Sequence, residues 1–310
     1  MEPVRDFKIP EDVIGFIEEL GKFGGFTATM LYDAAKILEE MIEDGDSLNF
    51  LSFPACIIAT GCRGAIVELI KRKRFHAIVT TCGTLDHDLA RSFADYYHGT
   101  FFVDDRELWK KGIHRLGNVF IPVENYGPTI ERHMREILKG LEGKRIATYE
   151  LSREIGRYIY ENSDRYEESI LYRARKHRIP VIVPGITDGA VGYQIRLFSQ
   201  MHEIYVDVLK DESMMDELVH AKPRTGAFMI GGGISKHHVI RRNQFKDGLD
   251  RAVYITTAVE RDGSLSGART REAISRGKVR GAAKHVTVPG EATVLVPLLT
   301  RYLVKKLASS

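Results

Sequence analysis

The residues best suited to covalent chemistry lie in one run near the C-terminal end of the chain, Glu272-Ala273-Ile274-Ser275-Arg276-Gly277-Lys278. The spacing predicts a helix that ends at Gly277, because glycine readily takes the conformation that closes a helix. Lys278 then follows on a loop. A lysine there is by default a solvated charge, whereas a lysine held neutral is a nucleophile that forms imines. The run by itself leaves both interpretations open.

A glycine-rich segment provides a second chemical feature, Gly231-Gly232-Gly233 followed by Ile234-Ser235-Lys236-His237-His238. Three glycines between a strand and a helix can cradle a phosphate, because their amides are accessible and a helix N-terminus attracts anions. The segment is not the Gly-x-Gly-x-x-Gly fingerprint of dinucleotide sites. Adjacent histidines on a helix face different directions, and no acid or cysteine is spaced to complete a metal site. We therefore interpret one histidine as a general base and predict no metal.

Polar residues also follow two further predicted strands. Cys82-Gly83-Thr84-Leu85-Asp86-His87-Asp88 comes after Ala77–Thr81, and Gly185-Ile186-Thr187-Asp188-Gly189 comes after Pro180–Pro184. The acids of the first segment can hold hydroxyls or an amine, and an acid at the end of a strand can bind a ribose hydroxyl. The alternatives are a helix cap for the first segment and an Asp-Gly turn for the second.

The elements that must position these residues are short apolar runs alternating with longer amphipathic ones. Over the first forty or so residues apolar side chains recur at helical spacing, and Gly45 is a suitable stop. The predicted strands beyond it are Leu48–Phe53, Ala77–Thr81, Asn118–Val123, Pro180–Pro184, Ile204–Val208, Ala227–Ile230, Ala252–Thr256 and Val286–Val288. Helical patterns between them include Gly64–Lys73, Thr129–Leu141, Glu154–Glu161 and Tyr166–His177.

This alternation is the pattern of a doubly wound α/β fold, in which a mainly parallel sheet carries helices on both faces. In such folds ligands bind at the carboxyl ends of the strands, where the polar segments begin. No repeat or long linker divides the chain. We therefore predict a helical N-terminal extension over residues 1–45 and a single α/β domain over residues 46–310.

Composition narrows the class of protein. The 45 lysines and arginines nearly balance the 42 aspartates and glutamates, and a net charge of +3 gives no case for nucleic-acid binding. The three cysteines form no Cys-x-x-Cys pair, which argues against a disulfide framework or a zinc site. The N-terminal run Met1-Glu2-Pro3-Val4-Arg5-Asp6 lacks the apolar core of a signal peptide, and no stretch is apolar enough for a membrane span. We expect a cytoplasmic protein.

Taken together, in their order and spacing, these segments resemble deoxyhypusine synthases. The resemblance rests on Gly231–His238, Ala252–Ala258, Asp262–Ala268 and Glu272–Lys278, and is extended by Thr80–Gly83 with Asp86 and Asp88, Arg115–Asn118 and Thr187–Gly189. It covers roughly residues 25–305 and is closest to the archaeal branch. It implies a Rossmann-like NAD-binding catalytic domain and a homotetramer with shared active sites.

The resemblance also implies the reaction. The family uses NAD to oxidise spermidine to an imine, and an enzyme lysine attacks this imine, expels diaminopropane and holds the aminobutyl group. The group then passes to a lysine of the hypusine-containing translation factor, here the archaeal one. Lys278 matches the nucleophilic lysine, which must be neutral and so needs a pKa lowered by burial or a nearby cation. His237 matches the residue that moves protons.

The remaining site residues are implied by their positions in the family pattern. Asp86, His87, Tyr254 and Glu272 stand at amine-binding positions, and His87 replaces the second acid of a Glu-Glu pair. The dinucleotide-contacting positions are Thr81, Cys82, Gly83, Asp188, Gly231, Gly232, Gly233, Thr257, Asp262, Ser266, Glu291 and Ala292, with Glu291 where the family usually has Asp.

Several positions of the amine pocket depart from the family pattern. Arg276 stands where the family usually has Trp, Arg241 where many members have Asn, and Tyr193 where Asp is usual. Leu265 replaces an Asp that is common in eukaryotic members. An arginine repels a polyamine cation, and Arg276 can also help to keep Lys278 neutral. Two alternatives therefore stay open: a related aminoalkyl transferase with another amine donor or acceptor, as in homospermidine synthases, and a non-catalytic NAD-binding subunit.

Overall fold

The chain forms two compact units in the computed structural model, which describes residues 3–309. The sheet unit comprises Met1–Phe53, Arg72–Val79 and Met215–Ser310, and the helical unit comprises Pro54–Lys71 and Thr80–Met214. Residues 1–2 and 310, which fall in the predicted ranges 1–45 and 46–310, lie outside the described residues. The single domain predicted for residues 46–310 stays a prediction.

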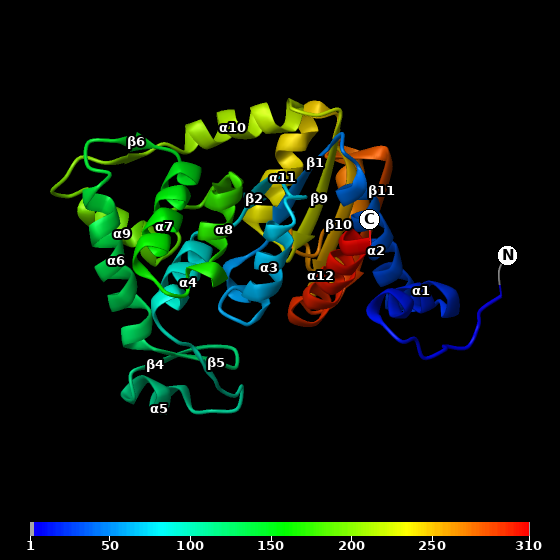
Figure 1. Cartoon of the computed structure of the whole chain (residues 1–310), viewed down its shortest axis with the longest axis horizontal. Helices are drawn as coiled ribbons and strands as arrows, with labels where there is room; N and C mark the ends of the chain where they lie inside the picture. Colours follow the sequence, from blue (N-terminus) through cyan, green and yellow to red (C-terminus); the bar gives the residue numbers. More distant parts are fainter. Residues whose placement is uncertain (1–2, 310) are drawn as a thin grey trace. The chain divides into compact units, whose positions relative to one another are not determined.

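The sheet unit is built on parallel strands in the order β11–β10–β9–β1–β2 (Figure 1). They are β1 (Ser47–Ser52), β2 (Ala77–Val79), β9 (Arg224–Ile230), β10 (Leu249–Thr256) and β11 (Val279–Pro289). β1 is buried along its whole length and β9 after its first residue. Strands covered on both faces tend to be nearly continuous apolar runs, and β2 and the second half of β9 follow this pattern. The predicted mainly parallel α/β fold is confirmed.

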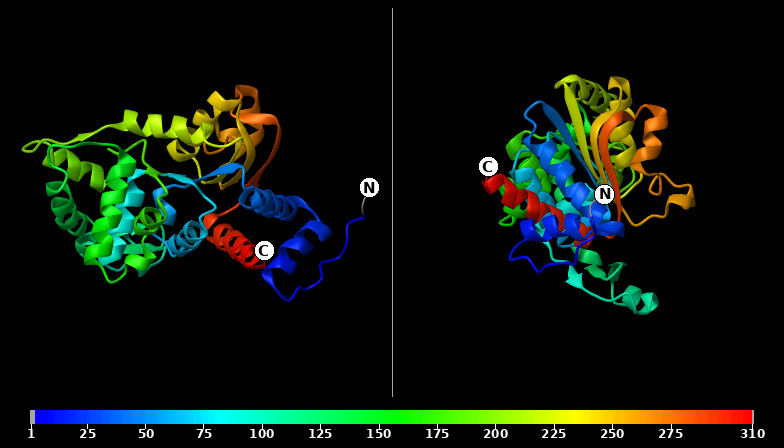
Figure 2. Two further views of the ribbon diagram at one scale, coloured as in Figure 1. Left: turned by 45° about the horizontal axis from the view of Figure 1, so that its top comes forward. Right: turned by 90° about the vertical axis from the view of Figure 1, so that its right-hand side faces the viewer.

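Helices cover both faces of this sheet (Figure 2). The helices of the unit are α1 (Val13–Phe23), α2 (Phe26–Glu43), α11 (Ile234–Asn243), α12 (Ala292–Ser309) and the 3-10 helices η4 (Gln244–Lys246), η5 (Glu260–Asp262) and η6 (Thr270–Arg276). A Cβ on Gly226 of β9 would lie 2.4 Å from Met41 Sδ of α2, whereas Met229 of β9 lines a pocket with Ile240 of α11. Positions three apart on a strand point to opposite faces, so α2 and α11 cover opposite faces. The predicted N-terminal helices are thus α1 and α2, and α2 belongs to a layer on the sheet.

The helical unit surrounds two small sheets. Its elements are η1 (Ala55–Ile57), α3 (Cys62–Lys71), α4 (Cys82–Phe93), β3 (Tyr97–His98), α5 (Asp105–Lys110), β4 (Ile113–Leu116), β5 (Val119–Pro122), η2 (Val123–Asn125), α6 (Gly127–Lys139), β6 (Arg145–Ile146), α7 (Thr148–Asn162), η3 (Tyr166–Glu168), α8 (Ile170–His177), β7 (Val181–Ile182), α9 (Ala190–Phe198) and β8 (Tyr205–Val206). α10 (Val208–His220) runs from this unit into the other.

Two predicted strands belong to these small sheets instead of the main one. The strand predicted at Asn118–Val123 is β5, which pairs antiparallel with β3 and β4. The strand predicted at Ile204–Val208 is β8, which pairs with β6. A positive φ of 60° at Gly117 closes the β4–β5 turn, because glycine takes that conformation without a steric penalty. An apolar run shows that a strand forms, and its partner depends on residues far away in sequence.

The largest difference in element bounds concerns β11. The sequence predicts a strand only at Val286–Val288, but β11 extends over Val279–Pro289 at the edge of the sheet. Its first half contains exposed or half-buried residues, so it lacks the apolar run of a central strand. Across residues 3–309, every helix is too short or too polar to cross a membrane.

Candidate active site

Lys278 and His237 form a close pair. The Nζ atom of Lys278 lies 3.0 Å from Nε2 of His237. Lys278 is only 7% exposed, so the interpretation of a solvated loop lysine is wrong. A nucleophile and a base within hydrogen-bond distance are the arrangement that covalent catalysis by an amine requires.

The local backbone fixes Lys278 immediately before β11. The 3-10 helix η6 ends at Gly277, as predicted, with a φ of 64°. The amide of Lys278 donates to the Ala273 carbonyl at 3.0 Å, and its own carbonyl accepts from the Leu249 amide at 3.1 Å. His237 lies in the first turn of α11, where its amide donates to the Gly233 carbonyl. Both side chains therefore project from anchored backbone.

The charges around the pair favour its neutral form. Burial lowers the pKa of Lys278 from its ordinary value of 10.5, and the charges of Arg276 and Arg241 lower it further. Burial also lowers the pKa of His237, with the Lys278 charge as the next cause. Since two cations at 3.0 Å repel each other, a neutral His237 accepts a hydrogen bond from Lys278 through Nε2. The geometry thus provides a proton acceptor for the lysine.

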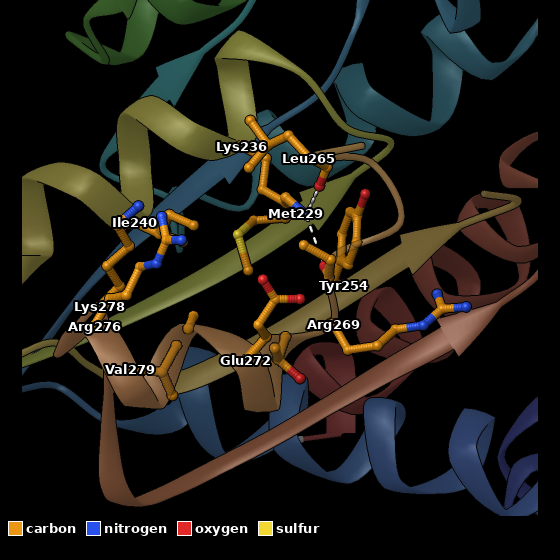
Figure 3. A pocket seen from close by; sticks show the side chains of 13 residues that line it. Met229, Lys236, Ile240, Tyr254, Leu265, Arg269, Glu272, Arg276, Lys278 and Val279 are labelled. Carbon is orange, nitrogen blue, oxygen red and sulfur yellow. Dashed lines mark hydrogen bonds between the residues drawn. The ribbon is translucent and has the colours of Figure 1, made fainter. Parts of the chain in front are cut away.

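Lys278 of this pair lines a pocket (Figure 3). Its lining is Met229, Lys236, Ile240, Tyr254, Leu265, Ala268, Arg269, Thr270, Glu272, Ala273, Arg276, Lys278 and Val279. The Glu272 carboxylate points into this space, and it is the one acid among these described lining residues. Tyr254 is fully buried and donates to the Ser266 carbonyl at 2.7 Å. The lining also contains the basic side chains of Lys236, Arg269, Arg276 and Lys278, so Glu272 is the lining residue whose charge attracts the ammonium group of an alkylamine.

Lys236 is a pocket residue that the sequence reasoning passed over. Its side chain is buried, donates to the Ala268 carbonyl at 2.9 Å and also to the Leu265 carbonyl. Its Nζ atom lies 3.9 Å from the centre of the Tyr254 ring. Burial lowers the pKa of Lys236 to about 8. Lys236 therefore connects the loop after β10 to α11. Its position next to His237 in the glycine-rich segment could have identified it as a site residue.

The predicted cofactor residues of the sheet unit gather at the carboxyl ends of three adjacent strands. Gly231 follows β9, Thr257 follows β10, and Glu291 with Ala292 follows β11. The Gly231 amide donates to the Ile255 carbonyl at 2.8 Å, and the Gly290 amide donates to the Thr256 carbonyl at 2.9 Å. The structure thus brings these segments together at the edge where α/β proteins bind nucleotides.

The glycine segment fits a phosphate. Gly231 and Gly233 have positive φ values of 66° and 79°, and α11 begins after Gly233 without a side-chain cap. The buried Ser235 hydroxyl has no hydrogen-bond partner within residues 3–309. A Cβ on Gly232 would lie 2.0 Å from Ser266 Oγ, so this glycine lets the loop of Ser266 pack against the segment. Open amides at a helix start suit the pyrophosphate of a dinucleotide.

Two other predicted cofactor residues of this unit are partly engaged. Asp262 accepts from the Ser264 amide at 2.7 Å and lies in the loop of Ser266. Glu291 accepts from the Thr293 hydroxyl at 2.5 Å and from the Val294 amide at 3.2 Å, so it also caps α12. Each carboxylate has a second oxygen for a ligand.

In the helical unit, the predicted cofactor residues lie in two neighbouring segments. Thr81 is the N-cap of α4, which begins with Cys82 and Gly83. A Cβ on Gly189 would lie 2.8 Å from Cys82 Sγ, so the turn that carries the exposed Asp188 packs against the start of α4. These residues come together within this unit, and their role in cofactor binding stays a prediction.

The acids of α4 serve as helix caps, although of other helices than their own. Asp86 accepts from the amides of Ala190 and Val191, at the start of α9. Asp88 accepts from the amides that begin α8 and from Arg63 Nε at 2.8 Å. His87 is buried, lies 3.0 Å from the Tyr96 hydroxyl and has a pKa lowered to about 4 by burial. The alternative that these acids cap the helix of their own segment is wrong, because the first turn of α4 contains no acid; they cap helices distant in sequence instead.

The loop after β1 is a further candidate that the sequence reasoning missed. The Ala55 amide donates to Thr81 Oγ1 at 3.1 Å, and a Cβ on Gly83 would lie 2.8 Å from Ala55 Cβ. The loop residues Pro54–Cys56 thus contact the predicted cofactor segment. The sequence could have identified this loop, because ligand sites follow the carboxyl ends of strands and the loop follows the strand predicted at Leu48–Phe53.

The residues that depart from the family pattern do not all face the pocket. Arg276 and Leu265 line it. Arg241 points its guanidinium at Gln244 Oε1, at 2.8 Å, and at the ring of Phe245, and it is absent from the described lining. Tyr193 is exposed on α9 of the helical unit.

A parallel sheet with a glycine-rich segment at its carboxyl edge defines an α/β nucleotide-binding architecture, and a buried lysine within hydrogen-bond distance of a histidine supplies the nucleophile and base that imine formation needs. The sequence model of the family described as deoxyhypusine synthase matches residues 15–303. The "probable deoxyhypusine synthase" of Picrophilus torridus is 50% identical over 98% of this chain and 97% of its own. The protein of the same name from Thermoplasma acidophilum is 50% identical over 96% of each chain. The chain belongs to the deoxyhypusine synthase family and is an enzyme that transfers an aminobutyl group.

A solved structure supports the same fold. The structure described as a deoxyhypusine synthase from Entamoeba histolytica is similar with a TM-score of 0.64, over 97% of this chain and 95% of that chain. At 19% identity, this likeness concerns the fold alone.

Proposed function

We propose that this enzyme takes the aminobutyl group from spermidine, holds it as an imine on Lys278, and passes it to a lysine of the archaeal hypusine-containing translation factor. The observation that carries the proposal is the 3.0 Å distance between Lys278 Nζ and His237 Nε2 beside a pocket with one acid. We also propose that the enzyme works in the cytoplasm as a homotetramer, as its family membership suggests.

NAD is the cofactor of the proposal, and when bound it would accept a hydride from the amine and return it to the imine on the acceptor lysine, so that the overall transfer needs no further oxidant or reductant. The amides of Gly232 and Gly233 and the start of α11 would hold its pyrophosphate, since backbone amides and the helix dipole attract anions. Gly231 would contribute its backbone conformation, because its amide donates to the Ile255 carbonyl. In the sheet unit, the second oxygen of Glu291 would accept a hydrogen bond from a ribose hydroxyl, and Thr257, Asp262, Ser266 and Ala292 are further proposed contacts. In the helical unit, the proposed contacts are Thr81–Gly83 and Asp188, whose carboxylate would accept a hydrogen bond from a ribose hydroxyl.

Lys278 and His237 carry the transfer itself. Neutral Lys278 attacks the carbon of the substrate imine, and its proton moves to His237 Nε2 across the short hydrogen bond. His237 then protonates the nitrogen of the departing diaminopropane. The low pKa of both groups suits this exchange, because each spends part of the cycle without its proton.

Glu272 and Tyr254 would orient the aminobutyl group. The Glu272 carboxylate attracts the distal ammonium, and the buried Tyr254 ring covers the alkyl chain. Asp86 and His87, the other predicted amine contacts, lie in the helical unit. There the Asp86 carboxylate and the His87 imidazole are engaged by protein groups.

The test is trapping of the imine with borohydride. We incubate the enzyme with NAD and spermidine labelled in the aminobutyl part, reduce it and map the label. The label is expected on Lys278 in the wild type and in the control Lys284→Arg. Lys284 is an exposed lysine of β11 that pairs with Glu40 of α2. Lys278→Arg should carry none. Label that persists in Lys278→Arg would contradict the mechanism, and transfer to the purified translation factor tests the acceptor.

A second candidate function is transfer from an amine of lower charge. Arg276 lines the pocket, and Glu272 is the one acid among its described lining residues, so the pocket can balance few ammonium groups. A related aminoalkyl transferase would give more trapped label with agmatine or putrescine than with spermidine under the same conditions.

A further inference from the structure

Asp86 makes contacts that suit a helix-capping residue better than an amine-binding residue. It is 1% exposed. Its Oδ2 atom accepts from the Tyr126 hydroxyl at 2.9 Å and from the Ala190 amide at 2.9 Å, and Oδ1 accepts from the Val191 amide at 2.8 Å. Cys82 Sγ lies 4.0 Å from Oδ1.

These contacts leave little room for a ligand on the carboxylate. Two oxygens offer about four acceptor directions, and three are occupied by good donors and the fourth by the thiol. Gly189 closes the remaining approach, because even a Cβ at that position would lie 2.8 Å from Oδ2. An ammonium ion could bind Asp86 only by displacing one of these donors.

The donors belong to the segment that carries Asp188. Ala190 and Val191 begin α9, whose N-cap residue Gly189 has no side chain to satisfy the first amides. Asp86 provides that cap from a different helix, 104 residues away in sequence from Ala190. Since Asp188 stands only two residues before Ala190, the cap fixes the turn on which the exposed Asp188 is held.

Tyr126 and His87 support the Asp86 carboxylate in its capping position. The Tyr126 hydroxyl orients the Asp86 carboxylate, and the His87 ring lies 5.4 Å from the Tyr126 ring. His87 in turn contacts the Tyr96 hydroxyl at 3.0 Å. The two predicted amine contacts, Asp86 and His87, thus face protein groups of the same unit.

We propose that Asp86, oriented by Tyr126, is a positioning residue for the cofactor turn at Asp188 and does not bind the amine substrate. This inference rests on the proposed function in one respect, that Asp188 binds NAD.

The experiment compares Asp86→Asn, Tyr126→Phe and the matched control Asp211→Asn. Asp211 is equally buried and caps the amides of Thr148 and Tyr149 at the start of α7, a helix without a predicted cofactor residue. For each protein we measure NAD affinity by calorimetry and the amine KM at saturating NAD. Hydrogen exchange at the Ala190 and Val191 amides, without any ligand, reports directly on the turn.

The expected result separates affinity for NAD from affinity for the amine. Hydrogen bonds to a charged group are strong enough that NAD binding should weaken at least about tenfold in Asp86→Asn and about fivefold in Tyr126→Phe. In Tyr126→Phe the amine KM should stay within about twofold and the two amides should exchange faster. Asp211→Asn should lower the melting temperature while NAD affinity is unchanged. Tyr126→Phe keeps the test decisive if Asp86→Asn does not fold.

Three results would overturn the inference. These are an unchanged NAD affinity in Tyr126→Phe, a rise in the amine KM without a change in NAD affinity, and an equal loss of NAD affinity in Asp211→Asn. Failure of the wild-type enzyme to bind NAD at all would instead refute the proposed function. The inference that Asp86 positions the turn of Asp188 for NAD would fall with it.

Discussion

Replacement of His237 by glutamine is the sharpest test of the proposed chemistry. Glutamine keeps a polar side chain near Lys278 but cannot take up a proton at neutral pH. A positioned general base contributes about 10²- to 10⁴-fold to a rate, and His237 Nε2 at 3.0 Å is placed to act on Lys278 directly. We therefore expect imine formation at neutral pH to slow by about that factor in His237→Gln.

The pH dependence of the imine-formation rate in His237→Gln gives a second, independent test. Without the base, only the fraction of Lys278 that is already neutral can attack. That fraction rises tenfold per pH unit until the pKa of Lys278, which burial and the arginine charges hold below 10.5. The deficit of the variant should therefore shrink steadily as the pH rises. The wild-type rate should depend less on pH, because the pKa of His237 is lowered and the base is already neutral.

The assay is single-turnover trapping with borohydride at a series of pH values, with NAD and amine saturating. His238→Gln is the control, because adjacent residues on α11 face different directions, and its rate should stay within about threefold of the wild type. A His237→Gln rate within threefold of the wild type at neutral pH would refute the reasoning. A deficit that is constant over the whole pH range would refute it as well, since it would show a loss of structure instead of a lost base.

Further predictions concern the charges and the backbone around Lys278. In Arg276→Gln the pKa of Lys278 should rise toward 10.5, since a repelling charge is removed, so the pH–rate curve should move to higher pH, whereas Arg276→Lys should leave it in place. Glu272→Gln should raise the amine KM by about tenfold or more, because a hydrogen bond to a charged group is lost, and calorimetry should show unchanged NAD affinity. In Gly232→Ala a Cβ would lie 2.0 Å from Ser266 Oγ, so the melting temperature should fall by several degrees and NAD affinity with it; an unchanged melting temperature would contradict this packing.

Much of the fold could be predicted from local pattern. β2 and the second halves of β9 and β10 are apolar runs, because a strand covered on both faces must bury both sides. β1 was predicted from Leu48, Phe50 and Leu51, although it also buries polar side chains. The strand β11 was predicted at less than its full length, because an edge strand exposes part of its residues. β5 and β8 were recognised as strands but not as members of separate sheets, since pairing depends on distant residues.

The candidate site shows the same division. The sequence determined that Gly277 closes a helix and that Lys278 follows it, because glycine is the residue that takes a positive φ without strain. It also placed His237 in the first turn after the glycine cradle.

Only the tertiary structure decided what these residues can do. It buries Lys278 and sets it 3.0 Å from His237, which lies 41 residues away in sequence. It also commits Asp86 to the start of α9, although its type and position suited an amine. The physical reason is that periodicity and backbone conformation are local, whereas desolvation and neighbouring charge arise from contacts between distant segments.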